Sequence, residues 1–403
     1  MPKDNPTNSV RPDWPAVGYE EHPWHIEDTF SLSNSKRATM RGPYKAAVPA
    51  RISALTPDLS SSTIAACEDA ATAIARFDAT YAVVNPPLAS VLLRTESVAS
   101  SQIENLSASA KQLALAELGA AKSQNAQLVY ANVKAMRAAV ELAENLDGPA
   151  IIEMQRVLLQ ESNPRIVGAW RSQQVWIGSS ALSPHTALFV PPHHARIQEL
   201  IDDLALFMRR TDLPQIAQIA IAHAQFETIH PFEDGNGRTG RAIVQAMLRA
   251  SGLADQSTVP LSAGILGRQS EYFAALDKFH DGNVQPIIDV FVNATFAAIA
   301  NGKALNDQLE QLLGGWQSVL KARRDSTAHR LLALLPSLPV VNIPALVQML
   351  DVTDMTAMAA VDKLVEVGAL RASSQSSRNR TWQSDAVLEA LDEFAARSLR
   401  KRI

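Results

Sequence analysis

The stretch that organises this chain reads His230-Pro231-Phe232-Glu233-Asp234-Gly235-Asn236-Gly237-Arg238-Thr239-Gly240-Arg241. An apolar run with helical spacing follows it at once, so we expect a loop that opens a helix, with the polar groups gathered at the opening. The first N–H groups of a helix have no partner within the helix, and the helix dipole adds partial positive charge there. Glycines also let the backbone come close to a ligand. The stretch therefore predicts an anion-binding site suited to phosphate.

The side chains of this stretch suggest a reaction as well as a binding site. His230 lies directly before the turn, where a neutral imidazole can take a proton from an incoming hydroxyl group. Asp234 offers one carboxylate for Mg²⁺, which is often held by a single carboxylate together with substrate phosphates. The backbone N–H groups of Gly235-Asn236-Gly237 would meet phosphate oxygens. Arg238 and Arg241 are three residues apart, so they share a helix face and can both reach the phosphates.

Two residues of the stretch are expected to do no chemistry. Phe232 is apolar within a polar loop, and we interpret it as the anchor that holds the loop to the core. Glu233 is expected to face outward. The alternative for the whole stretch is a surface loop with a helix cap, which a lone Gly-Asn-Gly would favour. A base, a metal ligand, an anion-binding turn and two arginines in register make the functional site the better interpretation.

The composition sets broad limits on the class of protein. A chain of 403 residues exceeds one compact core, so we expect two or three domains. Its 47% hydrophobic and 19% charged residues are ordinary for a folded soluble protein, and the net charge of −4 argues against binding of polyanions by the whole surface. Cys67 is the single cysteine, which excludes an intramolecular disulfide and fits the cytoplasm. We expect no signal peptide and no membrane span.

Helical periodicity dominates the chain from Ser60 onward, so the expected fold is mainly α. Residues 1 to about 40 are expected to form an extended, irregular arm. Two β-prone runs, Val175-Trp176-Ile177 and Leu188-Phe189-Val190, predict a β-hairpin flap within 164–192. Expected helices cover 60 to the Pro86-Pro87 break, then a segment ending near Ile103, then 108–122, 126–145, 149–160, 193–211, 213–227, 268–280, 284–301 and 304–324.

The last part of the chain predicts a separate module after the charged linker Lys321–Asp325. Three helices and a two-stranded wing within about 326–390 indicate a winged helix-turn-helix. DNA contact would use the third helix with Arg371, Arg378 and Arg380. That helix is poor in Arg and Lys, so protein contact or packing is slightly favoured over DNA contact. The basic tail that begins at Arg397 is expected to be a solvated end.

The central stretch resembles the signature of the Fic family, H-x-F-x-(D/E)-G-N-G-R-x-x-R, at every fixed position. The upstream run His223–Ile229 and the flap segments Gln174–Gly178 and Phe189–Pro192 are also similar to that family. The resemblance implies a Fic-type helical bundle with the β-hairpin flap. It also implies a protein adenylyltransferase, which transfers AMP from ATP to a Ser, Thr or Tyr hydroxyl group of a protein, or of itself, and releases pyrophosphate. Gly237 at the turn, rather than a lysine, argues against the phosphotransferase branch.

The resemblance implies a role for each site residue. His230 would be the general base, Asp234 would hold Mg²⁺, and Gly235 to Gly237 would stabilise the α- and β-phosphates of ATP. Arg238 and Arg241 would hold the phosphate tail. The flap would align the target peptide along its strand edge, through Val175, Trp176, Ile177 and Phe189. Members of the family often pair, so a homodimer is also implied. Tyr272 could contact adenine or could be a core aromatic.

A second, upstream pattern resembles the inhibitory motif of the family, (S/T)-x-x-x-E-(G/N). It reads Ser100-Ser101-Gln102-Ile103-Glu104-Asn105, and Ser100 and Glu104 share a helix face. The resemblance implies that Glu104 pairs with Arg241 and obstructs the γ-phosphate. An ordinary solvated glutamate is the alternative.

The expected organisation has three parts: 1–125 with the arm and the inhibitory motif, 126–320 as the catalytic core, and 326–403 as the winged helix and basic tail. Two other functions stay open. One is the reverse reaction, removal of AMP with Glu104 activating a water. The other is a DNA-binding regulator that senses nucleotide through an inactive core.

Overall fold

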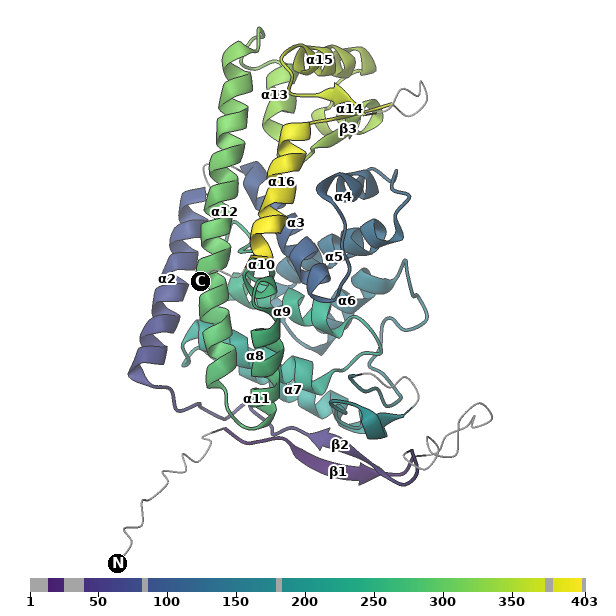
Figure 1. The fold of residues 1–403 in the computed structure, drawn as a ribbon, viewed down its shortest axis with the longest axis vertical. Helices are drawn as coiled ribbons and strands as arrows, with labels where there is room; N and C mark the ends of the chain where they lie inside the picture. The colour runs from purple at the N-terminus through teal and green to yellow at the C-terminus, as the bar shows by residue number, and fades with distance from the viewer. Residues whose placement is uncertain (1–13, 25–39, 82–85, 179–182, 374–379, 401–403) are drawn as a thin grey trace, which may run out of the picture.

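The computed structural model of the protein describes residues 14–24, 40–81, 86–178, 183–373 and 380–400. Most of the described residues are helical, and small sheets lie towards the two ends of the long axis (Figure 1). The predicted mainly α fold is therefore confirmed. No helix among the described residues is both long enough and apolar enough to cross a membrane.

The main body is a bundle of helices that follow one another along the chain. In order they are α2 (Ser61–Tyr81), α3 (Pro86–Ile103), α4 (Ala110–Glu117), α5 (Gln124–Glu141), α6 (Gly148–Leu159), α7 (Ile197–Met208), α8 (Gln215–Ile229), α9 (Asn236–Ala250), α10 (Leu261–Leu266), α11 (Gln269–His280) and α12 (Gln285–Val319). Local sequence sets several of the starts. Ser109 and Gln112 form a capping box on α4, and Asp147 caps α6 ahead of Pro149.

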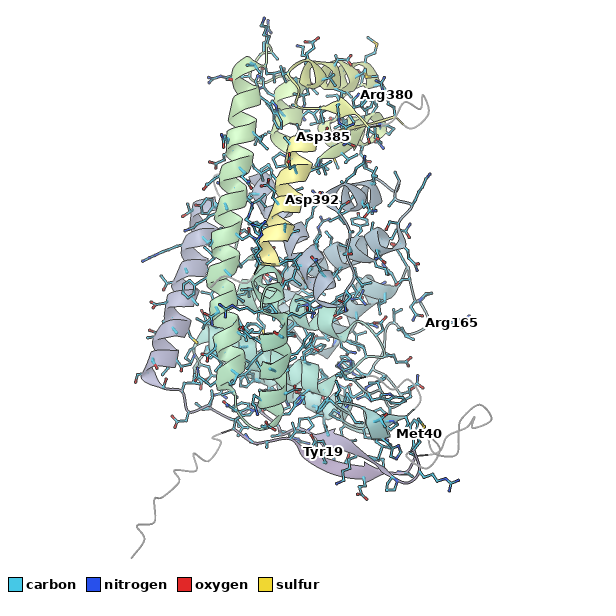
Figure 2. The ribbon with its side chains drawn as sticks, in the orientation of Figure 1. Tyr19, Met40, Arg165, Arg380, Asp385 and Asp392 are labelled. Carbon is cyan, nitrogen blue, oxygen red and sulfur yellow. The ribbon has the colours of Figure 1, made fainter. Side chains whose placement is uncertain are left out.

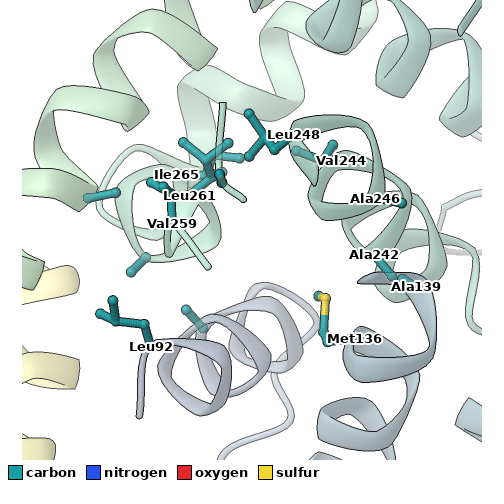
Figure 3. Close-up of a cluster of buried hydrophobic side chains, with 14 of the residues drawn as sticks. Leu92, Met136, Ala139, Ala242, Val244, Ala246, Leu248, Val259, Leu261 and Ile265 are labelled. Carbon is teal, nitrogen blue, oxygen red and sulfur yellow. The ribbon is translucent and has the colours of Figure 1, made fainter. Parts of the chain in front are cut away.

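The centre of the bundle is formed by α8 and α9. Helix α8 is buried along nearly its whole length, because small and branched apolar residues occur on all of its faces. Figure 3 shows Val244 and Leu248 of α9 beside Val259 and Ile265, with Leu92 of α3 and Met136 of α5 closing the same cluster. The loop between α8 and α9 is therefore carried by the best-packed part of the molecule.

Helix α3 is fixed to this centre by a buried carboxylate. Glu96 accepts hydrogen bonds from the Ser262 N–H (2.8 Å), the Ser262 hydroxyl (2.7 Å) and the Gln245 amide (3.0 Å). Burial raises the pKa of Glu96 to about 7, against the lowering effect of these donors. The contacts join α3 to α9 and to the start of α10.

The predicted division between 284–301 and 304–324 is wrong, because α12 is one continuous helix. Gly302 does not break it. A Cβ at Gly302 would lie 3.0 Å from the Phe77 ring and 3.6 Å from Leu92, so the glycine provides a close approach between helices. Helix α10, six residues long, is not among the predicted elements.

A two-stranded sheet replaces part of the irregular arm that we expect at the start of the chain. Strand β1 (Gly18–His22) pairs antiparallel with β2 (Tyr44–Val48), and the Ala47 N–H donates to the Val190 carbonyl at 2.9 Å. The described flap has less strand pairing than the predicted β-hairpin. Its described pairing is a single bridge between Ile177 and Phe189, and residues 179–182 lie outside the described residues.

The C-terminal part contains helices α13 (Thr327–Leu334), α14 (Ile343–Leu350) and α15 (Asp354–Glu366). Strands β3 (Val340–Asn342), β4 (Arg371–Ala372) and β5 (Thr381–Gln383) form a sheet in the order β3-β5-β4, with both pairs antiparallel. This order is compatible with a winged helix, which stays a prediction. Of the three arginines proposed for DNA contact, Arg378 lies outside the described residues, Arg371 pairs with Asp385, and Arg380 lies over the Trp382 ring at 5.0 Å.

Helix α16 (Asp385–Ser398) leads back from this part to the main body and packs along α12, beside α3 and α10 (Figures 1 and 2). The prediction of a simply solvated basic tail is wrong for Arg397. Its Nε donates to the Asn301 side chain at 2.7 Å, and its Nη1 donates to Gln308 at 3.2 Å. The C-terminal part is thus joined to the helical bundle through partly buried polar contacts.

We predict that Gly264→Ala destabilises the protein. A Cβ at this position would overlap the backbone of Ala294 in α12. The distance from that Cβ to the Cα of Ala294 would be only 2.7 Å. Backbone atoms cannot move aside as a flexible side chain can, so the cost should be about 1–3 kcal/mol in the free energy of unfolding, measured by urea denaturation.

The matched control is Gly314→Ala. Gly314 lies within α12, and no neighbouring atom lies within 4 Å of the Cβ that the substitution would add. It should stabilise the protein by about 0.5–1 kcal/mol, because alanine loses less entropy in a helix than glycine does. Equal effects of the two substitutions would contradict the packing of α10 on α12.

Candidate functional site

The loop between α8 and α9 is bounded by two residues in the left-handed region. His230 ends α8 with φ 49°, and its N–H donates to the Phe226 carbonyl at 2.9 Å. Gly235 precedes α9 with φ 84°. Positive φ is uncommon for a residue with a side chain, and strained backbone of this kind clusters at functional sites. The loop is thus a tight turn that places His230 directly before the start of α9.

The turn is closed by the Asn236 side chain. Its amide group accepts a hydrogen bond from the Phe232 N–H and donates one to the Phe232 carbonyl, each at 2.9 Å. Phe232 itself is fully buried, and its ring lies 5.1 Å from that of Trp170. The Asn236 side chain therefore holds the loop, and only its backbone remains for a ligand. The N–H groups of the first turn of α9 have no acceptor within the helix.

Glu104 lies against both arginines of α9. Its carboxylate accepts from Arg238 Nε at 3.0 Å and from Arg241 Nη2 at 2.7 Å. Arg241 also donates to the Ser100 hydroxyl (2.9 Å) and the Ser100 carbonyl (2.8 Å), and Ser100 is completely buried. The structure thus brings Ser100, Glu104, Arg238 and Arg241 together. The contact of Glu104 with Arg238 goes beyond the sequence expectation, which names only Arg241.

Gly237 makes room for this carboxylate. A Cβ at Gly237 would overlap Glu104 Oε1 and would lie 2.9 Å from Arg241 Nη1. The glycine therefore lets an anionic group approach the first turn of α9, where the helix dipole and the free N–H groups favour negative charge. In this structure that anionic group is the side chain of Glu104.

Asp234 lies at the outer edge of the loop. Its side chain is 55% exposed and lies 3.4 Å from Arg238 Nη2, and its Oδ1 accepts from the Gly235 N–H at 2.6 Å. No cluster of three or more His, Cys, Asp or Glu residues able to hold a metal ion occurs in the described ranges. A single exposed carboxylate fits Mg²⁺ only where substrate phosphates supply further oxygen ligands. Glu233 beside it is exposed, as its outward placement in the sequence interpretation requires.

His230 is a partly buried, neutral imidazole. Burial is the main cause that lowers its pKa to about 4, and the positive charge of Arg171 acts in the same direction. Arg171 Nε donates to the His230 carbonyl at 2.9 Å, and Arg171 Nη2 donates to the Pro192 carbonyl at 2.6 Å. A buried arginine therefore joins the loop to the base of the flap. The sequence pattern alone does not single out Arg171, because no motif contains it.

Two family models match the chain. The model described as Fic/DOC family covers residues 145–248, and the model described as Fic/DOC family N-terminal covers residues 64–141. Residues 145–248 are thus similar to the Fic/DOC domain, and residues 64–141 are similar to the N-terminal region of that family. The first match contains the whole loop, and the second contains Ser100 and Glu104.

The curated proteins that are similar to this chain are longer than it. "Protein adenylyltransferase fic-1" of Caenorhabditis elegans is 28% identical over 152 residues, which is 37% of this chain and 27% of the relative. "Protein adenylyltransferase Fic" of Nematostella vectensis is 28% identical over 159 residues, which is 39% of this chain and 34% of the relative. The chain thus spans about a quarter to a third of the length of these relatives.

The fold also has a counterpart among solved structures. A Fic family protein from Desulfovibrio desulfuricans G20 matches with a TM-score of 0.51 and 20% sequence identity, over 81% of this chain and 96% of that chain. Because the sequence identity is only 20%, this match supports a shared fold and no more. The Fic-type helical bundle is therefore confirmed.

A second layer of polar groups lies beneath the arginines of the Fic motif. His223 is fully buried and its Nε2 lies 2.7 Å from the Tyr272 hydroxyl, while Glu227 lies 3.8 Å from the same nitrogen. Burial lowers the pKa of His223 to about 3 and raises that of Glu227 to about 7. Tyr272 is 1% exposed, so it belongs to this buried layer. A substrate contact by its ring would require rearrangement.

The flap of the Fic domain presents both an inner and an outer side. Phe189 is buried, and its ring stacks on His280 with centroids 4.1 Å apart. Trp176 is half-buried, with its ring 5.5 Å from that of Trp24, and Val175 is half-buried beside it. Ile177 is 38% exposed and is the residue that bridges to Phe189. The Ile177 backbone is engaged within the flap, because its N–H donates to the Phe189 carbonyl and its carbonyl accepts from the Leu188 and Phe189 N–H groups. The alignment of a target peptide by the flap stays a prediction.

We predict that His223 makes the fold sensitive to acid. Its ordinary pKa is 6.5 and its folded pKa is about 3, so below pH 6.5 the unfolded chain takes up a proton that the folded protein refuses. The contribution of neutral His223 to the free energy of unfolding is therefore fully present above pH 6.5, and it is lost as the pH falls towards 3. At pH 5 the loss should be about 2 kcal/mol in the free energy of unfolding, measured by urea denaturation.

The control is His223→Gln, which keeps a donor for Tyr272 but has no group that titrates in this range. Between pH 7 and pH 5, the free energy of unfolding of this variant should fall by about 2 kcal/mol less than that of the unmodified protein. Glu227 has the opposite sign, because its raised pKa favours the folded state at low pH, but it is present in both proteins. Identical pH profiles for the two proteins would contradict the neutral state of buried His223.

Proposed function

We propose that this protein is a protein adenylyltransferase restrained by its own Glu104. The observation that carries the proposal is the pairing of Glu104 with both buried arginines at the start of α9, directly beside a neutral His230. An internal anion at a helix N-terminus marks where a substrate anion belongs. The relatives named protein adenylyltransferase support ATP as that substrate.

Buried polar atoms without partners support a missing ligand at the same place. Arg238 Nη1 and Thr239 Oγ1 are both buried and make no hydrogen bond within the described part of the chain. Leaving such a group unsatisfied costs about 1–3 kcal/mol, so native proteins keep few of them. Both belong to the first turns of α9, and phosphate or ribose oxygens could satisfy them.

The proposed reaction joins one oxygen to the α-phosphorus of ATP. The hydroxyl oxygen of a Ser, Thr or Tyr side chain forms a bond to that phosphorus while its proton passes to His230, and the bond to pyrophosphate breaks. The first turn of α9 and the two arginines would stabilise the charge on the phosphates. Mg²⁺ held by Asp234 and the phosphates would neutralise further charge when bound. The acceptor is either a second protein or this chain itself.

Glu104 would restrain the reaction by occupying the arginines. Its two ion pairs use Arg238 Nε and Arg241 Nη2, the groups that the γ- and β-phosphates would need. The side chain is 30% exposed, so it can leave towards solvent without unfolding α3. Restraint of this kind is a competition between two anions for the same donors.

We predict that Glu104→Gly increases the transfer of AMP from ATP with Mg²⁺, because both arginines become free for phosphates. His230→Ala in the same background should lower that transfer by about 10²–10⁴-fold, since the proton acceptor is lost. Mass spectrometry of the intact protein measures the added AMP, and peptide mapping separates self-modification from modification of an added protein. Glu104→Gln keeps the shape of the side chain and loses its charge. Its AMP transfer should therefore lie between that of the unmodified protein and that of Glu104→Gly.

A Glu104→Gly protein that binds ATP but transfers nothing would contradict the restraint. Release of AMP from a modified target by the unmodified protein would instead favour the reverse reaction, with Glu104 acting on water. The structure gives that alternative less support, because both carboxylate oxygens already accept from arginines.

For the C-terminal part we propose protein contact or packing rather than DNA contact. The exposed surface of α15 carries Asp354, Asp362 and Glu366 against Lys363, a balance that repels phosphates. An electrophoretic mobility shift with duplex DNA at about 50 mM salt should therefore be absent. A shift that disappears at higher salt would overturn this assignment.

A further inference from the structure

Arg171 is a buried arginine that bonds to separate segments of the chain. Its Nε donates to the His230 carbonyl at 2.9 Å, its Nη1 to the Gln173 carbonyl at 3.0 Å, and its Nη2 to the Pro192 carbonyl at 2.6 Å. Its backbone N–H donates to the Pro231 carbonyl at 2.9 Å. The segments that Arg171 joins are the His230 turn, residues 230–231, and the flap base, residues 171–175 and 190–192.

Gln174 holds the flap base together in a different way. Its Nε2 donates to the Pro191 carbonyl at 2.9 Å, and its Oε1 accepts from the Tyr44 hydroxyl at 3.1 Å. Within the described ranges, no hydrogen bond joins Gln174 to the His230 turn. The side chain that links the flap base to this turn is therefore that of Arg171.

The contacts of Arg171 use the shape of its guanidinium group. In the part of the chain that the structure describes, Arg171 forms no ion pair with Asp or Glu, and its three side-chain acceptors are backbone carbonyls. Burial lowers its pKa to about 10, so the group stays positive at neutral pH. A buried cation without an acidic partner costs free energy. A planar fork of five donors can bond to carbonyls from several segments at once.

The groups proposed to bind phosphate are held by other contacts. Arg238 and Arg241 lie in α9 and bond to residues of α3. The rest of the loop is closed by the Asn236 side chain and by buried Phe232. Loss of the Arg171 side chain should therefore release the His230 turn and leave the phosphate-binding donors in place.

We propose that Arg171 is a positioning residue, which fixes the His230 turn against the flap base and so sets the place of the His230 ring in the site. The inference rests on the proposed function, in which His230 takes the proton of the acceptor hydroxyl group. Arg171 acts through His230 and is not a catalytic residue. Because a misplacement of about 1 Å can lower a rate by about 10²-fold, Arg171 should affect the rate of AMP transfer and not the binding of ATP.

The link between the two segments is tested without any activity measurement. Hydrogen–deuterium exchange of the full chain reports the N–H groups of His230 and Phe232, both of which are hydrogen bonded. In Arg171→Met, exchange in peptides covering residues 229–236 and residues 171–177 should become about three- to tenfold faster.

Gln174→Met is the matched control for exchange, because it loosens the flap base alone. It should speed exchange over residues 171–177 and leave residues 229–236 unchanged. Arg171→Lys keeps the charge without the planar fork, so it should also speed exchange over residues 229–236, and it decides the question if Arg171→Met does not fold. Unchanged exchange there, or an equal effect of Gln174→Met, would overturn the proposal.

The effect on the reaction is measured in the Glu104→Gly background. Arg171→Met should lower AMP transfer at saturating ATP by about 10–10²-fold, while the Kd for ATP with Mg²⁺ stays within about twofold. Arg171→Lys should lower the transfer by about tenfold, because an ammonium group cannot bond to all three carbonyls. Full transfer by Arg171→Lys, or a loss of ATP binding that matches the loss of transfer, would overturn the positioning role.

Arg210→Met is the control for a general loss of stability. Arg210 also bonds to backbone carbonyls, those of Ser53 and Leu55, and within the described ranges it makes no hydrogen bond to the His230 turn. Its AMP transfer should stay within about twofold of the Glu104→Gly protein at a temperature at which both are folded. A loss as large as that of Arg171→Met would contradict the proposal.

The two measurements separate this inference from the proposed function. A Glu104→Gly protein that transfers no AMP would contradict the proposed function. The exchange data would still decide whether Arg171 holds the His230 turn.

Discussion

The contact of one carboxylate with two buried guanidinium groups is the interaction on which the rest of this structure depends. Arg238 and Arg241 are 4% and 3% exposed, and two positive charges at that depth need a negative partner. Glu104 supplies it from a distant segment, and Ser100 completes the donors of Arg241. In the proposed function, binding and restraint therefore use the same groups. A nucleotide would bind productively only by replacing the carboxylate.

The rigid surroundings explain why this contact has a defined geometry. The loop is closed by the Asn236 amide, Phe232 is buried below it, and Arg171 ties it to the flap. A site held by backbone hydrogen bonds needs little rearrangement when a ligand arrives, so its donors are already in place. The Glu104 side chain is the partly exposed member of the cluster that it forms with Ser100, Arg238 and Arg241.

Local sequence patterns predict much of this fold. They fail where an element depends on residues that are distant along the chain. The helices with regular apolar spacing are predictable, as is the loop that opens α9, because each depends on neighbouring residues. Strand β1 is not, since only its pairing with β2 and the link onward to Val190 make that polar segment a strand. Gly302 misleads for a related reason, because its role is set by Phe77, far away in sequence. Arg171 and Glu96 belong to no motif, and only burial distinguishes them from solvated charges.

The buried Glu96 has a consequence for how this protein can change over evolution. Glu96 and Ser100 are four residues apart in α3 and share one side of the helix. Glu104 follows four residues later, in the turn that ends the helix. The first is fixed to Gln245 and Ser262, and the last meets the arginines. One inserted residue between them would rotate Glu104 by about 100° and shift it by about 1.5 Å. The number of residues between the anchor and the carboxylate is therefore a dimension of the site. Length changes in this segment would alter the proposed restraint without altering any of the groups proposed to contact a nucleotide.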